Sequence, residues 1–183
     1  MKSNLLVMVF VVIVLLIMSM IGCTKSTTSL AAVPTVCGFI AGHNANDETT
    51  HATNGILLGV SFTASTNLSL KSISAKFDNA GSFALGVYSD SAGLPGTLLG
   101  QTLEQQSVIG WNSVTLTPIS IISGTKYWLV VGAPGASIYL SAVAVYSSIT
   151  MGSFYSALLP TNPTPADWTE VYYLPEMYAS GCN

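Results

Sequence analysis

Both histidines of the chain lie in one polar stretch, residues 38–53, together with two carboxylates. Imidazole and carboxylate groups are ligands for Zn²⁺ or Ca²⁺, which makes His43, Asp47 and His51 candidate metal ligands, with Glu48 beside them. The stretch has neither the His-x-x-x-His spacing of a helical zinc site nor the alternating Asp/Asn pattern of a calcium loop. Its Asn, Asp, Thr and Gly residues also suit a long surface loop. We favour a polar connecting loop with no metal and no cofactor.

Recognisable catalytic motifs are absent from the sequence. It contains no G-x-S-x-G elbow, no phosphate-binding loop and no nucleophile spaced from a base in a known pattern. The eight acidic residues leave a glycosidase carboxylate pair open, but none lies in a recognisable catalytic strand. Asp90 is most simply a turn residue. We therefore expect a protein that is not an enzyme.

Aromatic side chains carry the remaining functional signal. Exposed Trp and Tyr rings can stack against sugar rings, although packing in the core is the competing use of such residues. Trp128 lies inside a strand-like run and is expected to be buried. Trp168 and Tyr155 flank a Pro-rich stretch, residues 157–165, and are the better surface candidates. The candidate ligand-binding residues are Trp111, Tyr155, Trp168 and Tyr172, and Tyr173 belongs to the same aromatic group.

The composition excludes one class of partner. Only 7% of the residues are charged, and 5 basic residues face 8 acidic ones, for a net charge of −3. Nucleic acids are bound by dense Lys and Arg, and this chain has no Arg at all. We expect no nucleic-acid partner.

The start of the chain predicts export. Residues 1–22 comprise Lys2, an apolar run and Gly22, and Cys23 follows directly. Residues 20–23 resemble a bacterial lipobox, in which the Cys is lipidated and becomes the first residue, although Met20 stands where Leu is usual. An uncleaved signal-anchor helix is the alternative. Both interpretations anchor the protein in the membrane and place the domain outside the cytoplasmic membrane, at the cell surface or in the periplasm.

A tether and a single domain follow the export segment. Residues 23–35 are rich in Ser and Thr and nearly uncharged, which indicates a flexible tether. Residues 36–183, about 150 residues, are enough to build an independent core. Cys37 and Cys182 remain after Cys23 is set aside, and in an oxidising compartment we expect them to form a disulfide rather than two free thiols. The bond requires Cα atoms roughly 4.4 to 6.8 Å apart and would make the first and last strands neighbours.

Alternating apolar residues predict strands throughout the domain. The clearest is 56–63, where Ile56, Leu58, Val60 and Phe62 alternate with other residues. The alternation changes parity before Ile73, which predicts a bulge near residues 71–72, and a turn follows at 78–81. Residues 89–96 form a second predicted turn, and residues 138–145 form a strand that is apolar on both faces. The sequence predicts an all-β fold.

Three motifs inside residues 83–132 resemble those of a known family. They are GVYSDSAGLPGTLL at 86–99, GW at 110–111 and SGTKYWLVV at 123–131. The sequence is similar to β-sandwich modules of bacterial and archaeal surface proteins, of the choice-of-anchor type, whose architecture is like that of carbohydrate-binding modules. The resemblance covers roughly residues 55–180. It implies a two-sheet, antiparallel, jelly-roll-like β-sandwich, and its motifs are structural rather than catalytic.

Two functional hypotheses follow. The leading hypothesis is a membrane-anchored, non-catalytic cell-surface module that binds a glycan or another surface ligand in adhesion or recognition. The alternative is a structural subunit of a surface fibre or coat, a homo-oligomer assembled by adding a strand to a neighbour's sheet edge. The partners expected are therefore the membrane, a surface ligand and, in the second case, further copies of the chain.

Overall fold

The described part of the chain consists of strands, turns and loops. The structure, a computed structural model, describes residues 36–183 except 46, 53–54, 143–147, 152–157 and 165–167. No helix long and apolar enough to cross a membrane occurs within these residues. The predicted export segment with Cys23, the predicted tether and Tyr155 lie outside the described residues.

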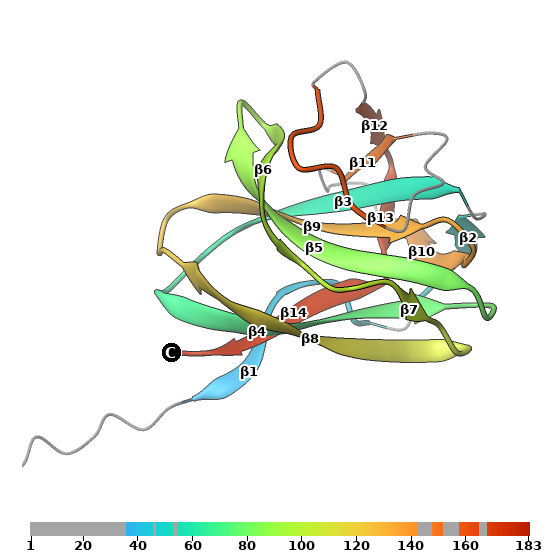
Figure 1. The fold of residues 1–183 in the computed structure, drawn as a ribbon, viewed down its shortest axis with the longest axis horizontal. Coiled ribbons are helices and arrows are strands. Elements are labelled where there is room, and N and C mark those ends of the chain that lie inside the picture. The colour runs from blue at the N-terminus through green and yellow to red at the C-terminus, as the bar shows by residue number, and fades with distance from the viewer. Residues whose placement is uncertain (1–35, 46, 53–54, 143–147, 152–157, 165–167) are drawn as a thin grey trace, which may run out of the picture. The chain divides into compact units, whose positions relative to one another are not determined.

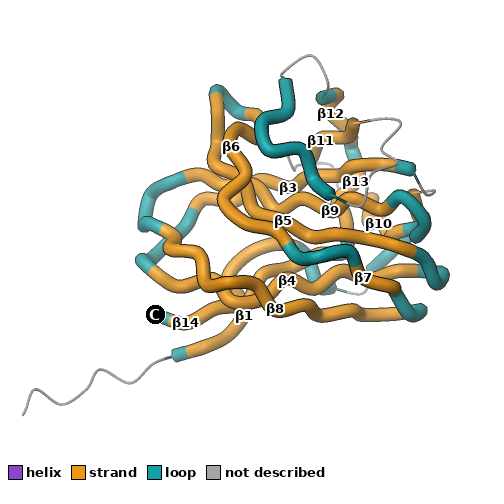
Figure 2. Tube along the Cα trace, viewed as in Figure 1, coloured by secondary structure: helices purple, strands orange, loops and turns teal. Residues whose placement is uncertain are grey.

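Two antiparallel sheets form the two layers in Figure 1, as predicted for a β-sandwich. Figure 2 shows the same strands with the loops that join them. The first sheet contains β1 (Cys37–Gly42), β2 (Thr50–Ala52), β4 (Leu68–Phe77), β8 (Gly110–Ile121), β10 (Ile138–Ala142), β13 (Tyr173–Pro175) and β14 (Met177–Cys182). The second contains β3 (Ile56–Thr63), β5 (Ser82–Ser91), β6 (Leu94–Gln101), β7 (Gln105–Gln106), β9 (Lys126–Ala133), β11 (Ser148–Met151) and β12 (Thr169–Val171).

Strand β4 contains the predicted irregularity. Its register with β8 shifts between Leu70 and Ser72, which confirms the bulge expected near residues 71–72. In a regular strand, Leu70 and Ile73 would point to opposite faces because three positions separate them. The extra residue of the bulge lets both side chains reach the core. The predicted turn at 78–81 also occurs, because β4 ends at Phe77 and β5 begins at Ser82.

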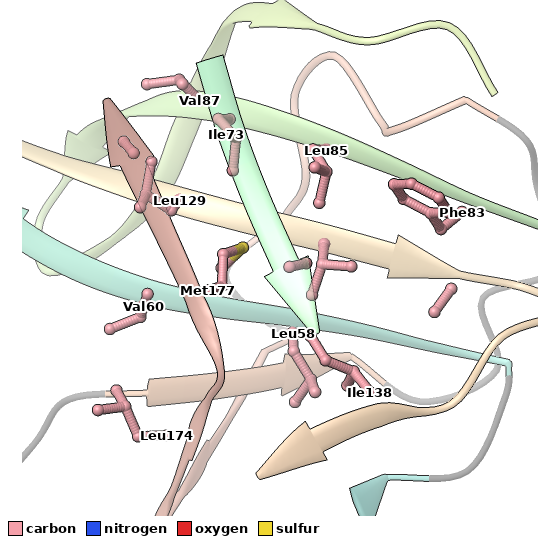
Figure 3. Close-up of a cluster of buried hydrophobic side chains, with 14 of the residues drawn as sticks. Leu58, Val60, Ile73, Phe83, Leu85, Val87, Leu129, Ile138, Leu174 and Met177 are labelled. Carbon is pink, nitrogen blue, oxygen red and sulfur yellow. The ribbon is translucent and has the colours of Figure 1, made fainter. Parts of the chain in front are cut away.

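The main core fills the space between the sheets. Leu58 and Val60 of β3 and Leu129 of β9 face Ile73 of β4 and Met177 of β14, and all five are almost fully buried (Figure 3). Leu58, Val60 and Ile73 are among the apolar members of the alternation read from the sequence. Removal of their surface from water is the main stabilising contribution to the fold.

The second sheet is apolar on its outer face as well. Trp128, Tyr88 and Leu57 point away from the main core and pack with Leu159 and Trp168 in a smaller cluster. The Tyr88 hydroxyl donates a hydrogen bond of 2.7 Å to the Pro160 carbonyl oxygen. The Pro-rich segment therefore covers this face of the sheet.

A disulfide joins the two ends of the domain, as predicted. Cys37 and Cys182 face each other across the antiparallel ladder of β1 and β14. Their Cα atoms lie 4.1 Å apart, just below the predicted range. The two cysteines are directly opposed in the ladder, where the shorter class of antiparallel pairs has Cα atoms about 4.5 Å apart. The disulfide is compatible with an oxidising extracellular environment.

Two predicted loops are shorter than expected. Strands β5 and β6 extend to Ser91 and from Leu94, so the predicted turn at 89–96 reduces to Ala92 and Gly93. Both residues have positive φ, 52° and 87°, as a two-residue hairpin turn requires. The polar stretch 38–53 is also only partly a loop. Strand β1 includes its first residues and β2 its last ones, and residues 43–49 connect the two strands.

Candidate functional site

The loop of residues 43–49 lies on the outer face of the first sheet. Ile138 and Leu140 of β10 belong to the core, so the alternate residues Tyr139 and Ser141 point to the opposite face. Backbone hydrogen bonds secure the loop at both ends, from His43 N to the Met177 carbonyl oxygen at 2.7 Å and from Thr49 N to the Leu140 carbonyl oxygen at 3.0 Å. Within this loop, Asp47 therefore meets Ser141 on the outer face of β10, and His43 meets Glu176 at the β13–β14 junction.

Four polar side chains converge there, and we call them the His43 cluster: His43, Asp47, Ser141 and Glu176. His43 Nε2 lies 2.7 Å from Asp47 Oδ1 and 3.2 Å from Glu176 Oε1. Ser141 Oγ lies 2.7 Å from the same Asp47 oxygen and 2.5 Å from the same Glu176 oxygen. Asp47 Oδ1 and Glu176 Oε1 thus each contact both the His43 imidazole and the Ser141 hydroxyl.

Glu176 lies at the point where three strands meet. Its backbone N–H donates to the Tyr139 carbonyl oxygen at 2.9 Å, and its carbonyl oxygen accepts from Lys76 N at 2.9 Å. It separates β13, which pairs with β10, from β14, which pairs with β4. The side chain is fully buried, and Oε2 has no hydrogen-bond partner. The two carboxylates of the cluster therefore have different surroundings, because the Asp47 side chain is half exposed.

The environment moves the pKa values of the two carboxylates in opposite directions. Burial raises the pKa of Glu176 above its ordinary value, since the charged form is desolvated. The hydrogen bond from Ser141, followed by that from His43, lowers the pKa of Asp47 to about 2. At neutral pH, Asp47 is therefore the more firmly charged member of the pair.

The structure brings together only part of the predicted metal set. His43 and Asp47 meet as considered from the sequence, but His51 is directed elsewhere, with Nδ1 3.4 Å from Asp78 Oδ2. Glu48 forms an ion pair of 2.6 Å with Lys76 beside the cluster. Sequence reasoning missed Ser141 and Glu176. The signal for Glu176 was a lone acidic residue between the apolar residues Pro175 and Met177.

A groove opens between the edges of the two sheets. It has a volume of about 330 Å³. Its walls come from β2, β10 and β13 of the first sheet and from β3 and β12 of the second. The lining residues are His51, Ala52, Ile56, Leu58, Leu140, Val171 and Tyr173. The groove is apolar at its base, with one imidazole and one phenol ring.

The aromatic candidates occupy different environments. Trp128 is fully buried, as expected. The expectation that Trp168 lies at the surface is wrong, because it is only 8% exposed and packs in the outer cluster of the second sheet. Trp111 on β8 packs edge-to-face against Tyr178, with ring centroids 5.1 Å apart. Tyr172, between β12 and β13, is 83% exposed.

No protein-family model and no curated protein sequence matches this chain. The resemblance to choice-of-anchor-type modules therefore stays a prediction, and the site is interpreted from its own geometry.

Proposed function

We propose that the chain is a membrane-anchored, non-catalytic recognition module that binds a glycan at the cell surface. The observation that carries this proposal is the groove between the sheet edges, with Tyr173 in its wall. The lipobox-like segment before the domain supports the anchor, and the disulfide fits export. The neighbouring positions of β1 and β14 support a jelly-roll-like connection of the strands.

The groove has the surface chemistry that a sugar ring requires. Tyr173 lines the groove and is 46% exposed, and an accessible Tyr ring is the kind of group against which the C–H side of a sugar stacks. His51, half exposed in its side chain, can exchange hydrogen bonds with hydroxyl groups at the rim. Tyr172, the residue before Tyr173, is 83% exposed but does not line the groove. No carboxylate lines the described walls, whereas glycoside hydrolysis uses two, which favours binding over catalysis.

A glycan array tests the proposal with the full-length chain in detergent micelles. We expect binding to at least one polysaccharide, and Tyr173→Ala should weaken it by roughly tenfold or more, the equivalent of one lost stacking contact. Phe39→Ala is the matched control, because Phe39 is an exposed aromatic residue on β1, outside the groove. Absence of binding to any glycan, or equal binding by Tyr173→Ala and the unsubstituted chain, would refute the glycan proposal.

One observation favours the alternative of a fibre or coat subunit. Among the described strands, β1 pairs only with β14, and it begins directly after the predicted tether. Val36 and Phe39 at this edge are exposed, and both line a second groove of about 200 Å³. An open edge with exposed apolar side chains can accept a strand from another copy.

Light scattering of the full-length chain in detergent distinguishes the two functions. A structural subunit should form oligomers, and these should dissociate when Val36→Lys and Phe39→Lys are combined, since charged side chains block edge pairing. A single protomer per micelle, or oligomers that the double variant leaves intact, would remove the strand-addition hypothesis.

A further inference from the structure

We propose that the His43 cluster binds a divalent transition-metal ion, with Zn²⁺ the best match. The ligands are His43 Nε2 and the carboxylates of Asp47 and Glu176, whose donor atoms all lie within 4.8 Å of one another. The proposal is independent of the glycan groove. It rests on the contacts within the cluster and on the buried Glu176 carboxylate.

The cluster has too few hydrogens for its contacts. Four short contacts join His43 Nε2 and Ser141 Oγ to one oxygen each of Asp47 and Glu176. A ring nitrogen carries at most one hydrogen, and a hydroxyl carries one, so only two of the four contacts can be full hydrogen bonds. Each of the other two is either the weaker arm of a bifurcated hydrogen bond or a contact between lone pairs. Such an arrangement is stable when a positive centre lies among the atoms, either a proton or a metal ion.

The unpaired oxygen of Glu176 favours the metal ion over the proton. Glu176 Oε2 is buried and has no hydrogen-bond partner, although buried carboxylates are almost always paired or bound to a metal. A proton on Glu176 shared with Asp47 would supply a third hydrogen to the cluster, in a hydrogen bond between the two carboxyl groups, whereas an ion held by both oxygens of Glu176 also gives Oε2 a partner. An ion that engages the Glu176 carboxylate offsets the burial of its charge.

The spacing and rigidity of the cluster suit an ion of this size. Two ligands about 2.1 Å from a tetrahedral ion are roughly 3.4 Å apart. The 3.2 Å between His43 Nε2 and Glu176 Oε1 is close to that value, and the 2.7 Å between His43 and Asp47 is shorter. Asp47 is half exposed on the loop and can move outward by a fraction of an ångström, whereas Glu176 is fixed at the strand junction.

The ligand types select among ions. Zn²⁺ accepts imidazole nitrogen together with carboxylate oxygen at low coordination number. Ca²⁺ takes six to eight oxygen ligands, and Mg²⁺ prefers water and oxygen in an octahedron. A site with one imidazole and two carboxylates therefore prefers Zn²⁺, with water or the Ser141 hydroxyl as the remaining ligand.

Isothermal titration calorimetry tests the site in the full-length, tag-free chain in detergent micelles after treatment with EDTA. We expect one Zn²⁺ per chain and weaker binding of Ca²⁺. At a hundredfold excess over the Kd, Zn²⁺ should raise the Tm by roughly 5 to 10 °C. Asp47→Asn and His43→Gln should each weaken binding by roughly 100-fold or more, since loss of even an outer-shell partner costs 10- to 100-fold.

Matched controls separate this site from other zinc ligands. Glu104→Gln removes an exposed carboxylate in the loop between β6 and β7 and should leave Zn²⁺ binding unchanged. Cys23→Ser should also leave the stoichiometry unchanged, because that sulfur is not part of the site. Glu176→Gln should abolish Zn²⁺ binding, provided that the variant folds. Asp47 is half exposed, so Asp47→Asn should fold and tests the site even if Glu176→Gln does not.

Three results would overturn the assignment. The first is the absence of Zn²⁺ binding, and the second is binding that survives both Asp47→Asn and His43→Gln. The third is an infrared band of a protonated carboxylic acid that persists in excess Zn²⁺ and disappears in Glu176→Gln. That band would show that a shared proton, rather than a metal, occupies the cluster.

Discussion

The indole N–H of Trp128 donates a hydrogen bond of 2.8 Å to Asp90 Oδ1, which ties the β5–β6 turn to β9. The second oxygen, Asp90 Oδ2, accepts from Gly93 N at 3.1 Å within the turn. Lys126 Nζ lies 3.6 Å from Asp90 and 5.1 Å from the centre of the Trp128 ring. Residues of the YSDSAGLPG and GTKYWL motifs thus contact each other directly in the fold.

Replacement of Asp90 by Ala should destabilise the domain. The variant leaves the Trp128 N–H, on a fully buried ring, without its partner, and such an unsatisfied donor costs about 1 to 3 kcal/mol in the free energy of unfolding. Urea denaturation followed by Trp fluorescence measures the change. Glu104→Ala, which removes an exposed loop carboxylate, should have little effect. An unchanged denaturation midpoint in Asp90→Ala would contradict the role of this hydrogen bond.

The contribution of Asp90 should also depend on pH. Burial raises its pKa, but the hydrogen bonds from Trp128 and Gly93 and the charge of Lys126 outweigh burial, so the pKa lies below the ordinary value of 3.8. A carboxyl with a depressed folded-state pKa stabilises the fold fully above its unfolded pKa and loses that contribution as the pH falls through the folded value. The stability difference between the unsubstituted chain and Asp90→Ala should be constant from pH 7 to 5 and shrink below about pH 3.8. A difference that grows on acidification would contradict this sign.

The two buried Trp residues should differ in their tolerance of Phe. Trp128 bonds Asp90, whereas Trp168 Nε1 is buried without a hydrogen-bond partner. Both substitutions remove a similar volume, but Trp168→Phe also removes an unsatisfied donor. We expect Trp128→Phe to cost more, by roughly 1 to 3 kcal/mol, in parallel urea denaturation experiments. Equal losses would show that packing alone determines both values.

The Cys37–Cys182 disulfide should stabilise the domain. It closes a loop with a sequence separation of 145, for which the chain-entropy model gives an upper figure of about 5 kcal/mol. Denaturation with and without a reductant measures the contribution, and the Cys37→Ser, Cys182→Ser double variant should behave like the reduced protein. Recovery of both cysteines as free-thiol peptides, from protein made in its natural compartment, would contradict the bond.

Cys23 should carry lipid in the mature protein. We expect mass spectrometry to find an N-terminus at Cys23 with added acyl mass, because the lipobox-like residues 20–23 direct that processing. Cys23→Ser should retain Met1 and lose the acyl mass. An intact Met1 in the unsubstituted chain would instead establish the signal-anchor.

The sequence by itself determined the parts of this protein that depend on local patterns. Strand positions such as 56–63 follow from alternation with period 2, and the bulge before Ile73 follows from a change in that alternation. The disulfide followed from the number of cysteines and the expected compartment. Burial of Trp128 followed from its place within an apolar strand.

Tertiary structure alone decided which distant residues meet. His43 and Glu176 come from opposite ends of the domain, and no local pattern records that the β13–β14 junction lies beneath the loop 43–49. Trp168 appeared to be a surface residue because a Pro-rich segment suggests a loop. It is buried because the second sheet is apolar on both faces and needs a cover on its outer side. Period-2 alternation shows which residues share a face, whereas the packing of the whole chain decides what lies against that face.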